Sequence, residues 1–332
     1  VAAPLAWVVA GEPRALWRRR RALVAVPLVL AAGAFIGIYR QSLDWEQSQQ
    51  LEAFRMKAQE VGQLMQSSLS EHERFITAMS RALDTSGAGM VPRGFSGAAR
   101  SYLAQRPELL AMGWLPRVPH REREQVEDGA GSFYRKPYAI VDAGADNLPH
   151  PAARRPLYYP VLLVEPNTGT LLLGRDFLSE PKRARALGQA VATGRPIASP
   201  PLRLQKEGSG AIHLLQVAAS DRARAPPAGV LVLTLEVDRY VALALRQAGF
   251  DHSLMAFSDT TAGAAPTAII DGIGRSWREV DYRRELSFGG RTYLLRLAPT
   301  PAYLLANTGW QSWFVLTGGL LLTGLLGALL LV

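Results

Sequence analysis

Apolar residues form two long uncharged segments, one near each end of the chain. Residues 22–39 carry no charged side chain and lie between Arg21 and Arg40, a length close to the minimum that spans a bilayer. The arginines at 18–21 place residues 1–21 in the cytoplasm by the positive-inside rule. A cleaved signal peptide is the alternative, but no small-residue cleavage site follows the segment. We predict a first transmembrane helix at 22–39, after a basic segment that ends an earlier membrane region.

The second apolar segment, 310–332, is rich in Leu and Gly and is also long enough to span a bilayer. Trp310, Trp313 and Phe314 cluster at its start, where an aromatic belt lies at a membrane surface. We predict a second transmembrane helix here, so that residues 41–309 form one loop in the periplasm. The chain stops at the end of this segment, and we expect an output domain further on.

Residues 41–83 contain no Pro, and apolar residues recur at every third or fourth position. This period predicts one long helix with an apolar stripe. At 1.5 Å per residue it is roughly 60 Å long. It is either a stalk that pairs with a second copy of the chain or a core helix of one protomer. The stripe consists of Leu51, Phe54, Ala58, Val61, Met65, Leu69, Ile76, Met79 and Leu83.

Shorter patterns follow, and they predict an α+β protein with two tandem units, one at 84–225 and one at 226–305. In each unit a strand and a helix precede a closing hairpin, and the turns of these hairpins are at 207–210 and 289–290. In the first unit we expect helices at 95–105, 121–127 and 181–193, and strands at 109–115, 133–134, 138–141, 158–164, 202–205 and 211–218. In the second unit we expect a helix at 238–248 and strands at 230–235, 252–257, 268–271, 284–288 and 292–298.

One strand pattern ends at a carboxylate. The apolar run that begins at Tyr159 ends at Glu165, and after a turn Leu173 leads to Asp176. We interpret these residues as the floor and lip of a ligand pocket, because such pockets are mostly apolar with few fixed polar groups. Two alternatives stay open: Glu165 pairs with Arg175, or Asp176 serves the turn in which it lies.

Composition narrows the function classes. The chain has no Cys, which excludes disulfides, thiol chemistry and Cys-based zinc sites. Of the net charge of +9, residues 1–21 carry +4 and residues 310–332 carry none. The other charges are interspersed and form no basic stripe with aromatics, so we do not expect nucleic-acid binding.

Residues for catalysis or metal binding do not gather in the sequence. The five His residues are far apart, and His72 between Glu71 and Glu73 fits a helix face. No Gly-x-Ser-x-Gly motif occurs, and Gly272-Ile273-Gly274 lacks the third glycine of a nucleotide-binding loop. We expect no catalytic residues, no metal and no cofactor in this chain.

Three stretches, in order between the apolar segments, give the chain its resemblance to a known family. They are 113–118 with Glu122-Arg123, 159–166, and 173–176 with the helix to Gly194 and residues 198–202. Over residues 41–305 the chain resembles the CHASE domain, the extracellular sensory module of histidine kinases and nucleotide cyclases. The resemblance implies a stalk helix and two PAS-like units, of which the membrane-distal one binds a small ligand.

Plant members of this family bind cytokinins, with an Asp at the end of the pocket strand and a Thr after the helix. Here Glu165 ends the strand and Ser199 takes the Thr position. Each candidate also has a structural alternative: Trp114 as core, Ser199 as loop, Tyr159 and Leu173 as apolar wall. The expected ligand-binding residues are Trp114, Tyr159, Glu165, Leu173, Asp176 and Ser199.

These expectations describe the ligand-sensing input module of a receptor in the inner membrane, of histidine kinase or diguanylate cyclase type. The module binds a small molecule, cytokinin-like or other, and forms a homodimer through the stalk and membrane helices. The alternative is a structural or protein-interaction ectodomain that senses a periplasmic partner.

Overall fold

The computed structural model describes residues 14–83, 92–143, 148–166, 171–203, 210–218, 226–250, 253–261, 266–273, 282–300, 303 and 311–331. The chain divides into two compact units, Val1–Met56 with Pro299–Val332 and Lys57–Ala298. Some expectations lie outside the described residues: the segment 1–13, the hairpin turn at 207–209 and the belt residue Trp310.

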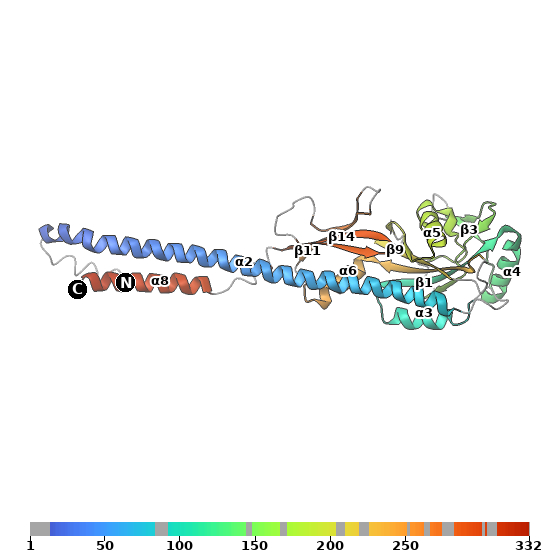
Figure 1. The fold of residues 1–332 in the computed structure, drawn as a ribbon, viewed down its shortest axis with the longest axis horizontal. Helices are drawn as coiled ribbons and strands as arrows, with labels where there is room; N and C mark the ends of the chain where they lie inside the picture. The colour runs from blue at the N-terminus through green and yellow to red at the C-terminus, as the bar shows by residue number, and fades with distance from the viewer. Residues whose placement is uncertain are drawn as a thin grey trace. The chain divides into compact units, whose positions relative to one another are not determined.

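A single helix, α2 (Arg14–Ala82), contains both the predicted membrane segment and the predicted stalk (Figure 1). Arg40 does not interrupt it, because Arg is a good helix former. By length and composition α2 is able to cross a membrane: its most apolar window has a mean hydropathy of 1.4, and none of that window is buried.

The second apolar segment forms α8 (Gln311–Leu331) in the first unit. Its described apolar part, Trp313–Leu329, is shorter than the about 20 residues that a membrane-spanning helix typically has. Small residues bring α8 close to α2: a Cβ on Gly319 would lie 2.8 Å from the Phe35 ring. The two helices therefore pack on each other in this unit, with other large apolar side chains left exposed.

The apolar stripe of α2 is buried within the second unit from Ala58 onward. Ala58, Val61, Met65 and Ile76 are 0% exposed in one protomer. The Tyr240 hydroxyl, in α6 (Val237–Gln247), donates to the backbone carbonyl of Met65. For this part of α2 the core-helix interpretation holds, and the stripe is not free to pair with a second copy.

The second unit contains a six-stranded antiparallel sheet, the first sheet, in the order β6-β1-β10-β9-β7, with β8 also paired to β9. Every residue of β10 is buried, which suits a central strand. The sequence pattern placed the strand 230–235 in the second tandem unit, but β10 pairs with β1 and β9. Strand pairing depends on residues distant in sequence, which a local pattern does not contain. The strands are β1 (Leu109–Pro116), β6 (Leu163–Glu165), β7 (Ile197–Ala198), β8 (Leu202–Arg203), β9 (Gly210–Ala218) and β10 (Gly229–Glu236).

The strand expected at 158–164 is wrong as one element. The structure divides it into β5 (Leu157–Tyr158), paired with β2 (Val118–Pro119), and β6. Between them Pro160 forms only an isolated bridge with Asp176. Pro has no backbone N–H to donate, so a continuous ladder is not formed at this position.

The helices of this unit lie on both faces of the first sheet. Helix α3 (Phe95–Ala104) packs against β1 and β6, and α5 (Pro181–Thr193) packs against β7 and β9, on the opposite face (Figure 1). The helix predicted at 181–193 is confirmed as α5. It has Pro181 in its first turn, and Gly194 after its end is in the left-handed conformation. Residues 133–134, expected as a strand, belong to α4 (Arg123–Tyr134), which follows the short helix η1 (His120–Glu122).

A second, four-stranded sheet has the order β12-β11-β14-β13. Its strands are β11 (Ser253–Asp259), β12 (Thr267–Asp271), β13 (Tyr282–Phe288) and β14 (Arg291–Pro299), and a small pair, β3 (Val141–Ala143) and β4 (Pro149–Pro151), lies elsewhere in the unit. The predicted two-residue turn at Gly289-Gly290 is confirmed, with φ values of 55° and 72° that favour Gly. The backbone N–H of Ala198 donates to the Gly289 carbonyl at 2.8 Å, so the turn touches β7.

Candidate functional site

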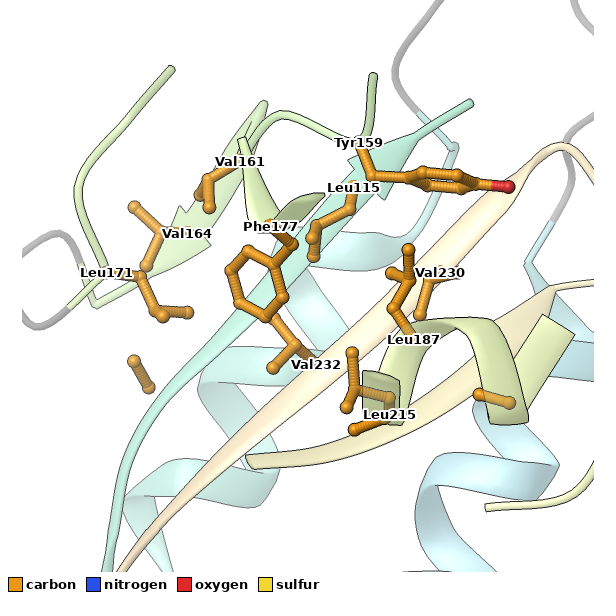
Figure 2. Packing of buried hydrophobic residues seen from close by; sticks show 13 residues of the cluster. Leu115, Tyr159, Val161, Val164, Leu171, Phe177, Leu187, Leu215, Val230 and Val232 are labelled. Atoms are coloured by element: carbon orange, nitrogen blue, oxygen red, sulfur yellow. The ribbon is translucent and has the colours of Figure 1, made fainter. Parts of the chain in front are cut away.

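Apolar side chains line the face of the first sheet that α5 covers, here called the α5 face. Leu115, Val230, Val232 and Leu215 project from β1, β10 and β9, because alternate residues of a strand share one face. Phe177, in the short helix η2 (Phe177–Ser179), packs on them (Figure 2). Val161, Val164, Leu171 and Leu187 complete the lining shown there.

A histidine lies on this face among the apolar residues. His213 is two positions before Leu215 in β9 and is 1% exposed. Its Nδ1 atom is 3.1 Å from the Thr234 hydroxyl on the neighbouring strand. The backbone N–H of His213 donates to the Ser199 hydroxyl at 3.1 Å, and Ser199 N–H donates to the His213 carbonyl at 2.8 Å. The other ring nitrogen, Nε2, is buried with no hydrogen-bond partner in the described part of the chain.

Two arginines lie near this histidine. The Arg183 guanidinium, on α5, is 5.3 Å from the centre of the Phe177 ring. The centre of the His213 ring is 5.5 Å from the centre of the same Phe177 ring. Arg183 pairs with Glu180 at 3.0 Å and its side chain is 14% exposed. Arg175 precedes η2, and its Nη2 atom is buried without a hydrogen-bond partner among the described residues. We call Arg175, Arg183 and His213 the basic cluster.

The basic cluster carries an excess of positive charge. Burial lowers the pKa of His213 well below its usual range, and the charges of Arg183 and Arg175 lower it further. Burial also lowers the pKa of Arg175 and of Arg183, an effect that the Glu180 carboxylate opposes in both. The imidazole is therefore neutral, and both arginines keep their charge because guanidinium does not deprotonate in proteins.

The carboxylate of Asp176 is fully engaged in structure. It accepts hydrogen bonds from the backbone N–H groups of Tyr159 at 2.8 Å and Leu178 at 3.2 Å, and pairs with Arg155 at 3.0 Å. Arg155 also pairs with Asp142 at 2.6 Å. The turn alternative for Asp176 fits these contacts, and Gly174, with φ +80°, is required there because a Cβ would lie 2.1 Å from the Ala139 carbonyl.

Two predicted ligand residues lie away from the α5 face. Trp114 is next to Leu115 in β1, so its side chain points to the opposite face, where it is 2% exposed. Glu165 is at the end of β6 and lies 3.8 Å from Arg100 of α3, not beside Arg175. The structure therefore does not bring Trp114 or Glu165 together with the basic cluster.

The other predicted residues are close to the α5 face. Tyr159 is a buried member of its apolar cluster, and Leu173 packs against that cluster from the side. In Figure 2 the Tyr159 hydroxyl points away from Phe177. Ser199 is 0% exposed and supports His213 through the backbone. Of the six, Tyr159, Leu173 and Ser199 are placed to contribute to one site.

A cleft of about 260 Å³ lies on the opposite side of the sheet, between α2, α6 and the loop that leads into β1. Its charged groups are paired: Arg106 with Glu71, and Glu108 with His72 at 3.5 Å. The Tyr240 hydroxyl bonds to the backbone there. The charged side chains that line the cleft thus already have partners within the protein. No three His, Asp or Glu side chains gather as a metal site among the described residues.

Sequence reasoning missed the basic cluster. A His within the apolar run 211–218 was a signal, since a buried polar residue needs a partner. Arg175 and Arg183 carried no comparable signal, because nothing local shows that either is buried. The proximity of Arg183 to His213 follows from the packing of α5 onto β9, and that of Arg175 from the packing of the adjacent η2 against α5.

Comparison with protein-family models matches residues 90–269 to the CHASE domain. No match is found among curated proteins.

Several solved structures are similar to the chain. One is an extracellular ligand-binding receptor from Desulfohalobium retbaense, 12% identical with a TM-score of 0.38, covering 75% of this chain and 38% of that one. Another is the ligand-binding domain of the Pseudomonas aeruginosa amino acid chemoreceptor PctC with GABA, 12% identical, TM-score 0.39, covering 74% and 99%. The P. aeruginosa chemoreceptor PctB with L-Arg is 10% identical, TM-score 0.42, covering 76% and 97%.

Proposed function

The chain belongs to the CHASE domain family, a family of extracellular sensory modules, and on that premise we propose that it binds a small molecule on the α5 face of the first sheet. One observation carries the location. Two buried polar atoms that have no hydrogen-bond partner among the described residues, His213 Nε2 and Arg175 Nη2, border a mostly apolar lining. A mostly apolar site with a few convergent polar groups is the usual form of a small-molecule pocket.

We further propose that the first sheet with α3, α4 and α5 is the membrane-distal unit and the second sheet the membrane-proximal unit. Residues 22–39 and 310–332 span the inner membrane, and the loop between them is periplasmic. The large apolar side chains that α2 and α8 leave exposed, such as Val29 at 69% and Leu325 at 73%, support this arrangement. A homodimer then uses helix faces other than the buried stripe of α2.

Signalling requires two conformations that the ligand binds unequally. Closure of α5 on a ligand displaces β7 and β9, and the Gly289 turn that contacts β7 passes this displacement to the second sheet. Family membership supports an output domain of histidine kinase or diguanylate cyclase type.

The test uses the full chain in lipid nanodiscs and a library of small periplasmic metabolites. Thermal melting identifies compounds that stabilise the protein, and hydrogen exchange with and without each compound locates the site. We expect a stabilising compound to increase protection in α5 and β9. A matched control is the cleft, where Leu243→Ala changes a lining residue and is expected to leave binding unchanged.

Protection confined to the cleft residues of α2 and α6 would reject the α5 face as the site. Stabilisation by a periplasmic protein and by no small molecule would favour the alternative of a protein-interaction ectodomain.

A further inference from the structure

We propose that the molecule taken on the α5 face carries a carboxylate, which the basic cluster of Arg175, Arg183 and His213 binds. This inference rests on the proposed function, because it names the ligand chemistry of the same site.

The charges around the cluster are unbalanced. Arg175 and Arg183 are both near Glu180, which is the acid that acts on each of them. Glu180 pairs with Arg183 at 3.0 Å, and the Arg175 Nη2 atom is left without an acceptor in the described structure. Arg175 is half-buried, and a buried guanidinium nitrogen costs free energy unless an acceptor compensates it, so an anion is the partner that this site would take.

The histidine adds a donor to the same place. When the Thr234 hydroxyl donates to Nδ1, the neutral ring carries its proton on Nε2, which then is a buried N–H donor without an acceptor. His213 and Arg183 flank the Phe177 ring from 5.5 and 5.3 Å. In that tautomer the unused polar atoms, His213 Nε2 and Arg175 Nη2, are both donors, which favour an oxyanion over a donor-rich ligand.

The two acidic side chains that were predicted to accept from a donor-rich, cytokinin-like molecule already have other partners. Asp176 is occupied by two backbone N–H groups and by Arg155, and Glu165 lies toward Arg100. The apolar lining around Phe177, Leu187 and Leu215 suits the carbon part of a small organic acid (Figure 2). A guanidinium fork matches the two oxygens of a carboxylate.

The experiment pairs small carboxylates with their amides, which have the same shape and no charge. The probes are acetate, succinate, benzoate and phenylacetate against the corresponding amides, with inorganic phosphate as a separate arm. Binding is measured by calorimetry and by thermal melting of the full chain in nanodiscs, at constant ionic strength. We expect at least one carboxylate to bind and its amide to bind at least tenfold more weakly.

Substitutions on α5 provide the matched control. Arg183→Gln and Arg175→Gln are expected to weaken carboxylate binding at least tenfold, whereas Arg185→Gln, at an exposed position two residues from Arg183, leaves it unchanged. Arg183→Lys keeps the charge and loses the fork, so it gives intermediate affinity and shows that loss of binding is not loss of folding. A purely structural role would lower the melting temperature of Arg183→Gln equally with and without the carboxylate.

Three outcomes overturn the proposal: equal binding of carboxylate and amide, binding of phosphate alone, or carboxylate binding that survives both Gln substitutions. If a neutral metabolite protects α5 and β9 from exchange, the proposed function is supported and the proposed carboxylate of the ligand is contradicted. If no compound protects these elements, both the small-molecule site on the α5 face and its carboxylate chemistry are contradicted.

Discussion

Among single residues, Asp176 shows how one buried carboxylate organises a turn. It is 0% exposed, and its oxygens bind two backbone N–H groups and Arg155. Burial raises its pKa, against the backbone hydrogen bonds and the charge of Arg155, which lower it. The residue therefore holds Tyr159 and η2 in place, and both of its carboxylate oxygens already have partners within the protein.

Asp176→Asn tests this role. Asn keeps an acceptor for the backbone N–H groups but loses the ion pair with Arg155, so we expect a loss of stability of about 2 kcal/mol. Glu165→Gln is the control, because that carboxylate is partly exposed and 3.8 Å from Arg100, and its loss is expected to cost no more than about 0.5 kcal/mol. Melting of both variants in nanodiscs measures the difference, and equal melting temperatures would contradict it.

His213 predicts a pH dependence of stability. Burial and the charges of Arg183 and Arg175 depress its pKa in the folded state, while in the unfolded chain it is about 6.5. Below about pH 6.5 the unfolded chain binds a proton that the folded chain does not, so stability is full above that pH and falls as the pH decreases. The loss is about 1.4 kcal/mol per pH unit.

Melting between pH 7.5 and 5.5 measures this slope. The groups near His213 are Thr234 on β10, Phe177 on η2, and the guanidinium groups of Arg175 and Arg183, of which Arg183 pairs with Glu180. His213→Gln is expected to flatten the slope, and His150→Gln, at an exposed position, to keep it. An unchanged slope in His213→Gln would mean that protonation of the His213 ring does not differ between the folded and the unfolded chain.

Between elements, the turn of the β13–β14 hairpin is one place where the second sheet contacts both α2 and the first sheet. Gln66 of α2 exchanges two hydrogen bonds with the backbone of Ser287, at 2.9 and 3.1 Å. The N–H of Gly289 donates to Glu73, and its carbonyl accepts from Ala198. The hairpin therefore joins three segments that are far apart in sequence.

Gly289→Ala is expected to break this junction. Its φ of +55° strains any other residue, and a Cβ would lie 2.2 Å from the Ala198 backbone nitrogen. We expect a loss of about 3 kcal/mol from strain and overpacking. Gly290→Ala is the control: it has φ +72° but its nearest neighbour is 3.7 Å away, so about 1 kcal/mol is expected from strain alone. Equal losses in thermal melting would show that the contact with β7 contributes nothing.

Elements with local signals were predictable from the sequence. Pro181 and Gly194 delimit α5, and Gly289-Gly290 marks a hairpin, because these residues act through their own backbone. The strand at 158–164 and the place of β10 were not, since both depend on pairing partners. The same limit applies to the candidate site. Trp114 and Glu165 are residue types that suit a ligand pocket, but the register of β1 and β6 places their side chains on the face away from α5.

For the whole molecule, the continuous helix α2 ties the sensory unit to the predicted membrane segment. Its 69 residues extend roughly 100 Å at 1.5 Å per residue, with Pro27 as an internal proline. The position of the membrane along this helix decides whether the α5 face meets periplasmic solutes.

The absence of cysteine makes this topology directly measurable, because each introduced thiol is the single one in the chain. Arg100→Cys, at a side chain that is 68% exposed on α3, is expected to react with a membrane-impermeant maleimide in intact spheroplasts. Arg18→Cys and Val332→Cys are expected to react only after detergent, since both lie on the cytoplasmic side of the proposed spans. Reaction of Arg18→Cys without detergent would reverse the orientation of the first span. Reaction of Val332→Cys without detergent would show that residues 310–332 do not cross the bilayer, and protection of all three positions would place the sensory unit in the cytoplasm.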